Sequence, residues 1–393
     1  MSTQNTPKDQ HTDDNKPDLS LEEARKVVWD ATTKIVSAFM ERQEAMEGIA
    51  NAKISEKGPS LSYSDLSVIR FDRENELLQR YENMAIENWE DPELVKMLIW
   101  YLMFAGKAKQ LQILWKDSVY GKEYIDDNTL LDNLLQLTWR VAETYDIYWE
   151  GFGGTIMIRE LETNFIREVA WSIWKKDIAI DLWSANGHIV RELQQIWFKN
   201  TIWYDICPEM LKQANAKSTG DNISFQEANL FEGIPHDNQS VDFIVSNFWS
   251  ASEVNKDIIP EVDRVLRTWG KAVLSFYNSN SITQSWWQPL QNWIEPILNP
   301  KSQILEVPIL DKDAPPKVYK LYAKPYSLDE IMSKITTSWL NLEKVWSFSP
   351  ALTMTPPTFY DSKWRKWDLK SYEEQHYYTW PYVWFYINII VSK

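Results

Sequence analysis

The sequence has little glycine, which accounts for only 11 of its 393 residues. Ordinary usage of about 7% would give roughly 28, so about 17 are missing. Tryptophan, normally one of the rarest residues, is present 22 times and is in surplus by a similar number. Because the deficit and the surplus are nearly equal and opposite, we interpret them as two effects of one cause.

Cysteine and long apolar runs are also scarce. The single cysteine, Cys207, excludes an intramolecular disulfide and a cysteine-based zinc site, and we expect no metal centre. The longest apolar run, 97–105, is far too short to span a membrane. The first 18 residues are polar and unlike a signal peptide. We therefore expect a soluble, cytoplasmic protein without a membrane partner.

Positive charge is outnumbered, with a net charge of −15 and a sequence pI of about 4.9. Phosphate binding needs clustered Lys and Arg, so nucleic acid is disfavoured as a partner. The basic run 363–366 is too short to reverse this. A small molecule is the favoured partner and a protein the second choice, while the oligomeric state is left open.

The chain is long enough for two domains. Residues 1–19 have the composition of a disordered tail. Residues 20–145 show mostly helical spacing, as in Leu21, Ala24, Val27 and Val28, with further helices expected at 91–105 and 128–144 and a loop at 56–65. We assign 146–393 to a second domain, with an insertion at about 278–326.

From about residue 170, strands and helices alternate. Strands are predicted at 177–182, 200–205, 222–226, 241–246 and 271–277, and helices at 186–196, 208–217 and 258–268. A helix at 327–335 and two late strands at 342–348 and 382–391 follow. This alternation predicts an α/β, Rossmann-like fold: a seven-stranded mixed sheet with helices on both faces, preceded by the helical region.

The first predicted strand ends in the run D-L-W-S-A-N-G, from Asp181 to Gly187. A strand, a tight turn and a helix in this order direct backbone N–H groups at a ligand. The second strand ends in Asp205, 24 positions after Asp181, where a carboxylate can accept both hydroxyls of a ribose. His188, at the helix start, is expected to be a solvated or capping residue rather than a base.

This pattern resembles the class I S-adenosylmethionine-dependent methyltransferases over about 145–393. In the family motif D-x-G-x-G-x-G, Asp181 and Gly187 match, Ala185 is a tolerated substitute and Trp183 departs. Three further motifs follow in the family's order: D-x-S-x-x-M-L at 205–211, the adenine-contacting pair at Asn229 and Leu230, and L-x-P-G-G at 266–270. Tyr145 and Asp146 resemble a motif that closes over the cofactor.

The resemblance implies S-adenosylmethionine as cofactor and in-line methyl transfer, with the acceptor entering over the carboxyl ends of the strands beside 145–152, 246–248 and the insertion. It assigns no catalytic acid or base. Tyr277 and Asn278 face the substrate or are structural. The implied cofactor-binding residues are Asp181, Trp183, Ser184, Ala185, Asn186, Gly187, Asp205, Ile206, Met210 (against the purine), Asn229, Leu230, Ser246 and Asn247.

The tryptophans allow several interpretations. Some bacterial genetic codes read UGA as glycine, and we hypothesise that Trp183, Trp203 and Trp269 are glycines in the native protein. Weaker candidates are Trp174, Trp197, Trp249, Trp339 and Trp384, whereas Trp286, Trp287 and Trp293 are expected to be genuine. A genuine Trp183 would instead make the chain a catalytically inactive binding protein. A nicotinamide-dependent oxidoreductase, which shares the turn and the ribose acid, is a further alternative.

Overall fold

The computed structural model describes residues 20–57, 71–88, 125–142, 153–183, 187–218, 220–247, 250–253, 257–279, 297–299, 303–311, 314–347 and 386–393, with scattered positions between 90 and 110. The described part contains no helix with the length and apolar character that a membrane crossing requires.

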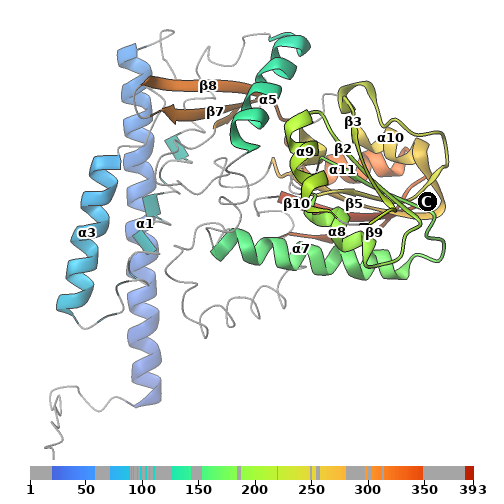
Figure 1. The fold of residues 1–393 in the computed structure, drawn as a ribbon. Helices are drawn as coiled ribbons and strands as arrows, with labels where there is room; N and C mark the ends of the chain where they lie inside the picture. Colours follow the sequence, from blue (N-terminus) through green and yellow to red (C-terminus); the bar gives the residue numbers. More distant parts are fainter. Residues whose placement is uncertain are drawn as a thin grey trace, which may run out of the picture.

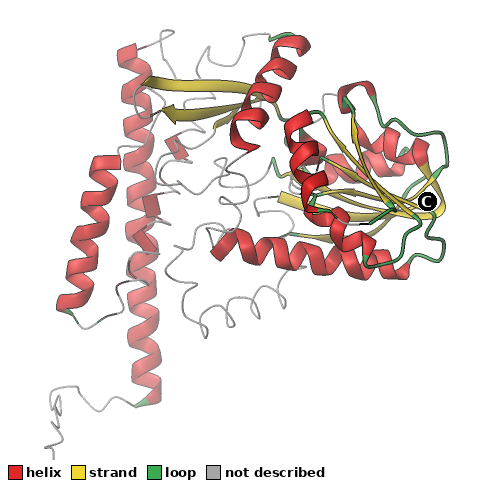
Figure 2. Ribbon diagram, in the orientation of Figure 1, coloured by secondary structure: helices red, strands yellow, loops and turns green. Residues whose placement is uncertain are grey.

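A seven-stranded sheet of order β3-β2-β1-β4-β5-β10-β9 forms the centre of the fold (Figures 1 and 2). The strands β3, β2, β1, β4 and β5 are parallel to their neighbours, and β10 is antiparallel to both β5 and β9. The predicted mixed seven-stranded sheet is therefore confirmed. The strand bounds are β1 Ile178–Leu182, β2 Asn200–Asp205, β3 Ile223–Glu227, β4 Val241–Ser246, β5 Leu266–Tyr277, β9 Asn341–Trp346 and β10 Tyr386–Ser392.

Both faces of this sheet are buried because its central strands are apolar on both sides. In β1, Ala179 belongs to one buried cluster, whereas Ile180 and Leu182 belong to the other. The first cluster is completed by α7 (Gly153–Ser172) and α8 (His188–Gln194), and the second by α10 (Ile258–Val265) and α11 (Leu328–Thr336). The continuous apolar runs thus specify a sheet between two helical layers.

The main error in the predicted bounds lies between α10 and β5. We expected a helix to residue 268, but α10 ends at Val265 and β5 begins at Leu266. Ser240, immediately before β4, donates its N–H to the carbonyl of Val265, and Val241 of β4 pairs with Leu266, so strand pairing begins where the helical pattern would continue. The helix α8 is also shorter than the predicted 186–196. By contrast, α9 (Pro208–Lys217) begins and ends as predicted.

The N-terminal region contains the long helix α1 (Leu21–Lys57), α3 (Phe71–Glu87) and α5 (Asp127–Val141), drawn in blue to green in Figure 1. The helix predicted at 91–105 is described only at scattered helical positions. The start of α5 is set by Asp126, whose side chain accepts the N–H of Thr129 at 3.0 Å. Helical structure in this region was predicted; the helix α7 was not.

The predicted insertion contains a second sheet that the sequence analysis missed. Its strands β6 (Ile297–Asn299), β7 (Ile304–Asp311) and β8 (Ala314–Tyr322) are antiparallel and pair in that order. Lys317 of β8 donates to the side chain of Gln136 on α5 at 2.7 Å. Leu305 and Tyr319 are buried in the same cluster as Leu134 of α5 and Phe165 of α7, so this sheet shares its core with both regions.

The amino end of β1 is attached to the neighbouring strands through one buried carboxylate. Asp242, at the start of β4 and only 2% exposed, accepts the backbone N–H groups of Asp177 and Ile178, each at 2.9 Å. Arg267 of β5 donates to the same carboxylate at 2.9 Å and to Asp177 at 3.2 Å. Three strands therefore depend on one anion for their register.

We expect Asp242→Ala to lower the free energy of unfolding by about 3–5 kcal/mol, because it leaves a partly buried guanidinium and two backbone donors without their acceptor. Urea unfolding of the variant checks this. Asp221→Ala, at an exposed position, is the matched control and should change the free energy by about 0.5 kcal/mol or less. Equal effects of the two substitutions would contradict the assigned role of Asp242.

Candidate functional site

The turn after β1 begins with a tryptophan in a backbone conformation that favours glycine. Trp183 has φ +73°, and its N–H donates to the carbonyl of Tyr204 in β2 at 3.0 Å. Its half-buried indole meets the ring of Phe231 edge-on, with 6.3 Å between ring centroids. A bulky residue at positive φ is an outlier, since the left-handed region crowds Cβ against the backbone. Ser184, Ala185 and Asn186 lie outside the described residues.

Gly187 ends this turn and is the residue before α8. Its φ is +72°, almost the same as that of Trp183. A Cβ here would come within 3.1 Å of the Ala214 Cβ and within 3.3 Å of the Phe225 ring. The backbone conformation therefore favours glycine at 187, and the room for a Cβ is tight.

Asp205 ends β2 and is only 3% exposed. Its Oδ1 accepts the N–H of Cys207 at 2.8 Å, and its carbonyl accepts the N–H of Ala228 at 3.1 Å, which joins the ends of β2 and β3. Burial raises the pKa of the Asp205 carboxyl to about 7, although the N–H groups of Cys207 and Ile206 act in the opposite direction by favouring the carboxylate. The side chain is thus placed to bind a polar group in an otherwise apolar setting.

Asn229 follows β3 and starts the short helix η3 (Leu230–Glu232). Its Oδ1 accepts the N–H of Phe231 at 3.1 Å, and its amide nitrogen donates to Glu232 at 3.0 Å. Leu230 is 5% exposed and belongs to the core on one face of the sheet. The pair predicted to contact adenine is therefore held rigidly, one residue by capping and the other by packing.

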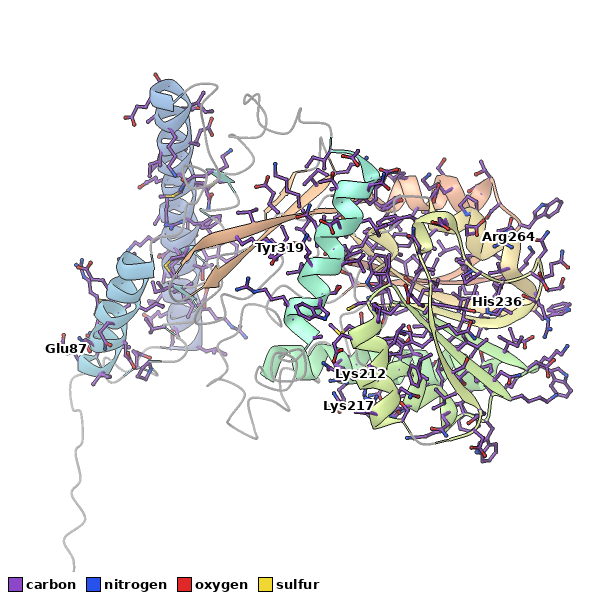
Figure 3. The ribbon with its side chains drawn as sticks, turned by 45° about the horizontal axis from the view of Figure 1, so that its top comes forward. Glu87, Lys212, Lys217, His236, Arg264 and Tyr319 are labelled. Carbon is purple, nitrogen blue, oxygen red and sulfur yellow. The ribbon has the colours of Figure 1, made fainter. Side chains whose placement is uncertain are left out.

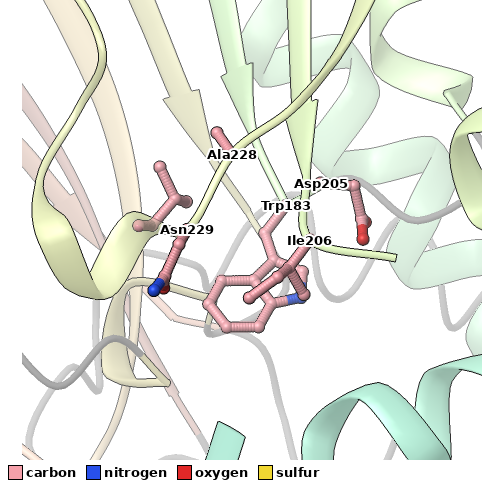
Figure 4. Close-up of a pocket in the computed structure, with 6 residues that line it drawn as sticks. Trp183, Asp205, Ile206, Ala228 and Asn229 are labelled. Atoms are coloured by element: carbon pink, nitrogen blue, oxygen red, sulfur yellow. The ribbon is translucent and has the colours of Figure 1, made fainter. Parts of the chain in front are cut away.

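The ends of β1, β2 and β3 meet around a shallow pocket (Figure 4), lined by Trp183, Asp205, Ile206, Ala228, Asn229 and Leu230. The indole of Trp183 lies in the middle of this view, with Asn229 and Asp205 to either side. About 190 Å³ of space, part of it open solvent, lies among these residues. The side chain at 183 therefore fills much of the pocket that its neighbours form.

Ser246 and Asn247 stand at the carboxyl end of β4. The Ser246 and Ser250 hydroxyls are 2.6 Å apart, and Ser250 also donates to the carbonyl of Leu182 at 3.4 Å, which joins this end of β4 to β1. Asn247 is 3% exposed, and neither atom of its amide has a hydrogen-bond partner among the described residues. Neither residue is among the lining residues of the pocket.

Two expectations need correction. Met210 does not line the pocket: it is 2% exposed and packs in a core cluster with Trp203, Cys207 and Ala214, because its position on α9 turns it toward β2. His188 is half-buried and is not the cap of α8, a position held by Gly187, and its Nε2 lies 3.1 Å from the Thr163 hydroxyl. Burial, followed by nearby arginines, lowers the pKa of His188 to about 3, so the ring is neutral at physiological pH.

The remaining predicted residues are buried. Asp181 is fully buried within β1 and is not among the lining residues of the pocket. Tyr277 is also fully buried, and its hydroxyl donates to Glu253 at 2.9 Å. Tyr145 and Asp146 lie outside the described residues.

Sequence reasoning missed Ala228 as a wall of the pocket and Phe231 as the aromatic neighbour of Trp183. Both residues flank the Asn229–Leu230 pair. Their position at the end of the third strand could have identified them as neighbours of the pocket.

The loop that follows η3 contacts both the end of β2 and the helix α10. Tyr204 hydrogen-bonds with the ring of His236 at 2.9 Å, and Arg264 on α10 donates to the carbonyls of Ile234 and His236 at 2.7 and 2.6 Å (Figure 3). Because this loop leaves directly from the pocket wall, α10 helps to hold the wall in place.

Comparison with known proteins relates part of the chain to a protein family. Residues 180–274 match the family model of a methyltransferase domain. No match was found among curated protein sequences.

Similar solved structures include an S-adenosylmethionine-dependent methyltransferase from Mesorhizobium loti (15% identity, 58% of this chain and 95% of that one, TM-score 0.39). Others are the CcbJ methyltransferase from Streptomyces caelestis (11%, 58% and 88%, TM-score 0.42) and the geranyl diphosphate C-methyltransferase from Streptomyces coelicolor A3(2) (11%, 60% and 79%, TM-score 0.38).

The family match is to methyltransferases and not to the nicotinamide-dependent oxidoreductases considered as an alternative. The match runs from within β1 to within β5 and includes the ends of β1, β2 and β3 that surround the pocket. The late strands β10 and β9 complete the sheet, as the resemblance implied. Residues 180–274 therefore match a methyltransferase domain, and S-adenosylmethionine is the cofactor that this match indicates.

Proposed function

We propose that the protein transfers a methyl group from S-adenosylmethionine to a small-molecule acceptor, and that it does so in a form with a small residue at position 183. The observation that supports this most directly is the buried Asp205 carboxylate beside the apolar side chains of Ile206 and Leu230, at the carboxyl edge of a parallel sheet. Ligands of open α/β sheets bind at this edge.

The residues around the pocket fit the cofactor except at one position. Asp205 would accept the ribose hydroxyls, while Ile206 and Leu230 would contact the adenine and Asn229 its polar edge. Gly187 lets the backbone pass closely. The indole at 183 does not fit, because it occupies space between these groups.

In methyl transfer of this kind, the main task of the protein is to position the cofactor and the acceptor. The cofactor supplies a methyl group already activated on a sulfonium, so proximity and alignment provide most of the rate enhancement. The chain contributes rigid support instead. Asn229 is fixed by its capping bonds, Asp205 by the N–H of Cys207, and the end of β4 by the Ser246–Ser250 contact.

The acceptor is proposed to enter beside the carboxyl ends of β4 and β5. Asn247 offers there a buried amide without a partner in the described part of the chain, a group that is costly to leave unsatisfied and that a substrate can satisfy. The net charge of −15 disfavours a nucleic acid, so we place a small molecule first and a protein second.

The second candidate function is a catalytically inactive binding protein. It is favoured by the same indole, which stands between Asp205 and Asn229 in the pocket if residue 183 is tryptophan.

Isothermal titration calorimetry with S-adenosylmethionine separates these functions. The chain with Trp183 should bind the cofactor at least tenfold more weakly than Trp183→Gly, because the indole competes for the pocket. Trp183→Phe is the matched control: it keeps an aromatic ring in the pocket and should remain weak. Asp205→Ala, combined with Trp183→Gly, should lose affinity relative to Trp183→Gly alone through the lost ribose contacts.

Absence of S-adenosylmethionine binding by Trp183→Gly would contradict the methyltransferase proposal. Binding of NAD by that variant instead would favour the oxidoreductase, and equal tight binding by all position-183 variants would show that the indole does not block the pocket.

Asp205 also gives a pH dependence of stability in the chain with Trp183. Its pKa is about 7 when folded and about 3.9 when unfolded. Between these values the folded state binds a proton that the unfolded chain has lost, so this residue makes the protein less stable as pH rises from about 4 to 7.

We therefore expect the free energy of unfolding of Asp205→Asn, relative to the parent, to rise on the order of a few kcal/mol over this range and to stay level above pH 7. Urea unfolding at several pH values measures the difference. A difference that is constant from pH 4 to 8 would contradict the raised pKa.

A further inference from the structure

Three tryptophans adopt a backbone conformation that L-residues with large side chains avoid. Among the described residues, five non-glycine residues have positive φ, and three of them are Trp183, Trp197 and Trp269, at +73°, +65° and +71°. Tryptophan supplies most of these positions although it accounts for only 22 of 393 residues. In folded proteins such positions are occupied mainly by glycine and, less often, by Asn or Asp.

Two of the three lie at turns where glycine commonly ends or begins a helix or strand, and the third, Trp269, lies within β5. Trp197 follows the end of α8, and its N–H donates to the carbonyl of Gln194 at 3.2 Å, as in a helix terminated by a left-handed residue. Trp269 precedes Gly270, and its N–H donates to the carbonyl of Lys393 at 2.6 Å. Trp183 has the same φ as Gly187 at the other end of the same turn.

The side chains at 197 and 269 do little that would justify this strain. They are 77% and 84% exposed, and the indole of Trp197 makes a T-shaped contact with that of Trp171, with 5.9 Å between centroids. Exposed indoles on left-handed backbone carry the conformational cost without substantial burial in return.

We infer that residues 183, 197 and 269 are glycines in the native protein, encoded by UGA codons that its own translation system reads as glycine. Each such codon converts one glycine into one tryptophan in the printed sequence, so these three positions contribute to the matched glycine deficit and tryptophan surplus. It rests on backbone conformation and composition, so it stands independently of the cofactor proposal. A glycine at 183 would also remove the indole that fills the pocket.

The other described tryptophan candidates do not have positive φ, so the inference does not include them. Trp203 lies within β2 without positive φ; it is fully buried, and its Nε1 has no hydrogen-bond partner in the described part of the chain. Trp174 and Trp339 are 98% and 83% exposed but also lack positive φ. Trp249, Trp286, Trp287, Trp293 and Trp384 lie outside the described residues. The inference is therefore restricted to positions 183, 197 and 269.

The conformational step is tested by paired substitutions to glycine and alanine. Both remove the indole and its contacts, but only alanine keeps the Cβ that positive φ disfavours. At 197 and 269, the glycine variant should melt a few degrees above the alanine variant. Trp139, 68% exposed within the helix α5, is the matched control, and there the alanine variant should melt higher. Alanine variants equal to or above glycine at 197 and 269 would overturn the inference.

The decoding step is tested on the native gene and protein. We expect UGA at codons 183, 197 and 269, and glycine at these positions in peptides of the protein isolated from its own cells and sequenced by mass spectrometry. UGG codons, or tryptophan in those peptides, would overturn the inference even if S-adenosylmethionine binds. Glycine there with no cofactor binding would support this inference while contradicting the proposed function.

Discussion

The site depends on one constraint: the chain must turn sharply at the end of β1 while remaining paired to β2. The N–H of residue 183 bonds to Tyr204, so the turn starts without leaving the sheet, and positive φ at 183 and again at Gly187 directs the chain into α8. Because β1, β2 and β3 are parallel neighbours, this turn passes beside Asp205 and Asn229. Whatever side chain stands at 183 therefore determines how much of the pocket is open.

The environment of Asp205 follows from the same packing. Its carboxyl is buried because β2 ends between the turn and the start of η3, and burial without a full set of donors raises its pKa. At the other end of the sheet, Asp242 has the opposite surroundings, with two backbone donors and Arg267 around it. Two buried acids of the same type thus have different roles, one holding the strands and the other available for a ligand.

Much of the fold could be predicted because the signals were local. The strands β2 and β4 follow from apolar runs that end at Asp205 and Ser246, and α9 begins at Pro208, a residue common in the first turn of helices; all three appear with the expected bounds. The overlong helix prediction at 258–268 failed because pairing with β4 decides that Leu266 begins a strand, and pairing is not visible in a local pattern. The second sheet, β6-β7-β8, was missed for a similar reason, since its strands are stabilised by one another and by α5.

Some features of the candidate site could likewise be predicted from the sequence, and others could not. The order of motifs and the spacing from Asp181 to Asp205 could be read from the chain, and so could the anomaly of tryptophan in a turn that needs glycine, because these are properties of residue identity and separation. Tertiary structure alone decided that Met210 packs into the core instead of the pocket, that His188 is neutral, and that Trp197 has a left-handed backbone whereas Trp203 does not. Side-chain direction, desolvation and backbone conformation depend on neighbours distant in sequence, and only the folded chain brings those neighbours together.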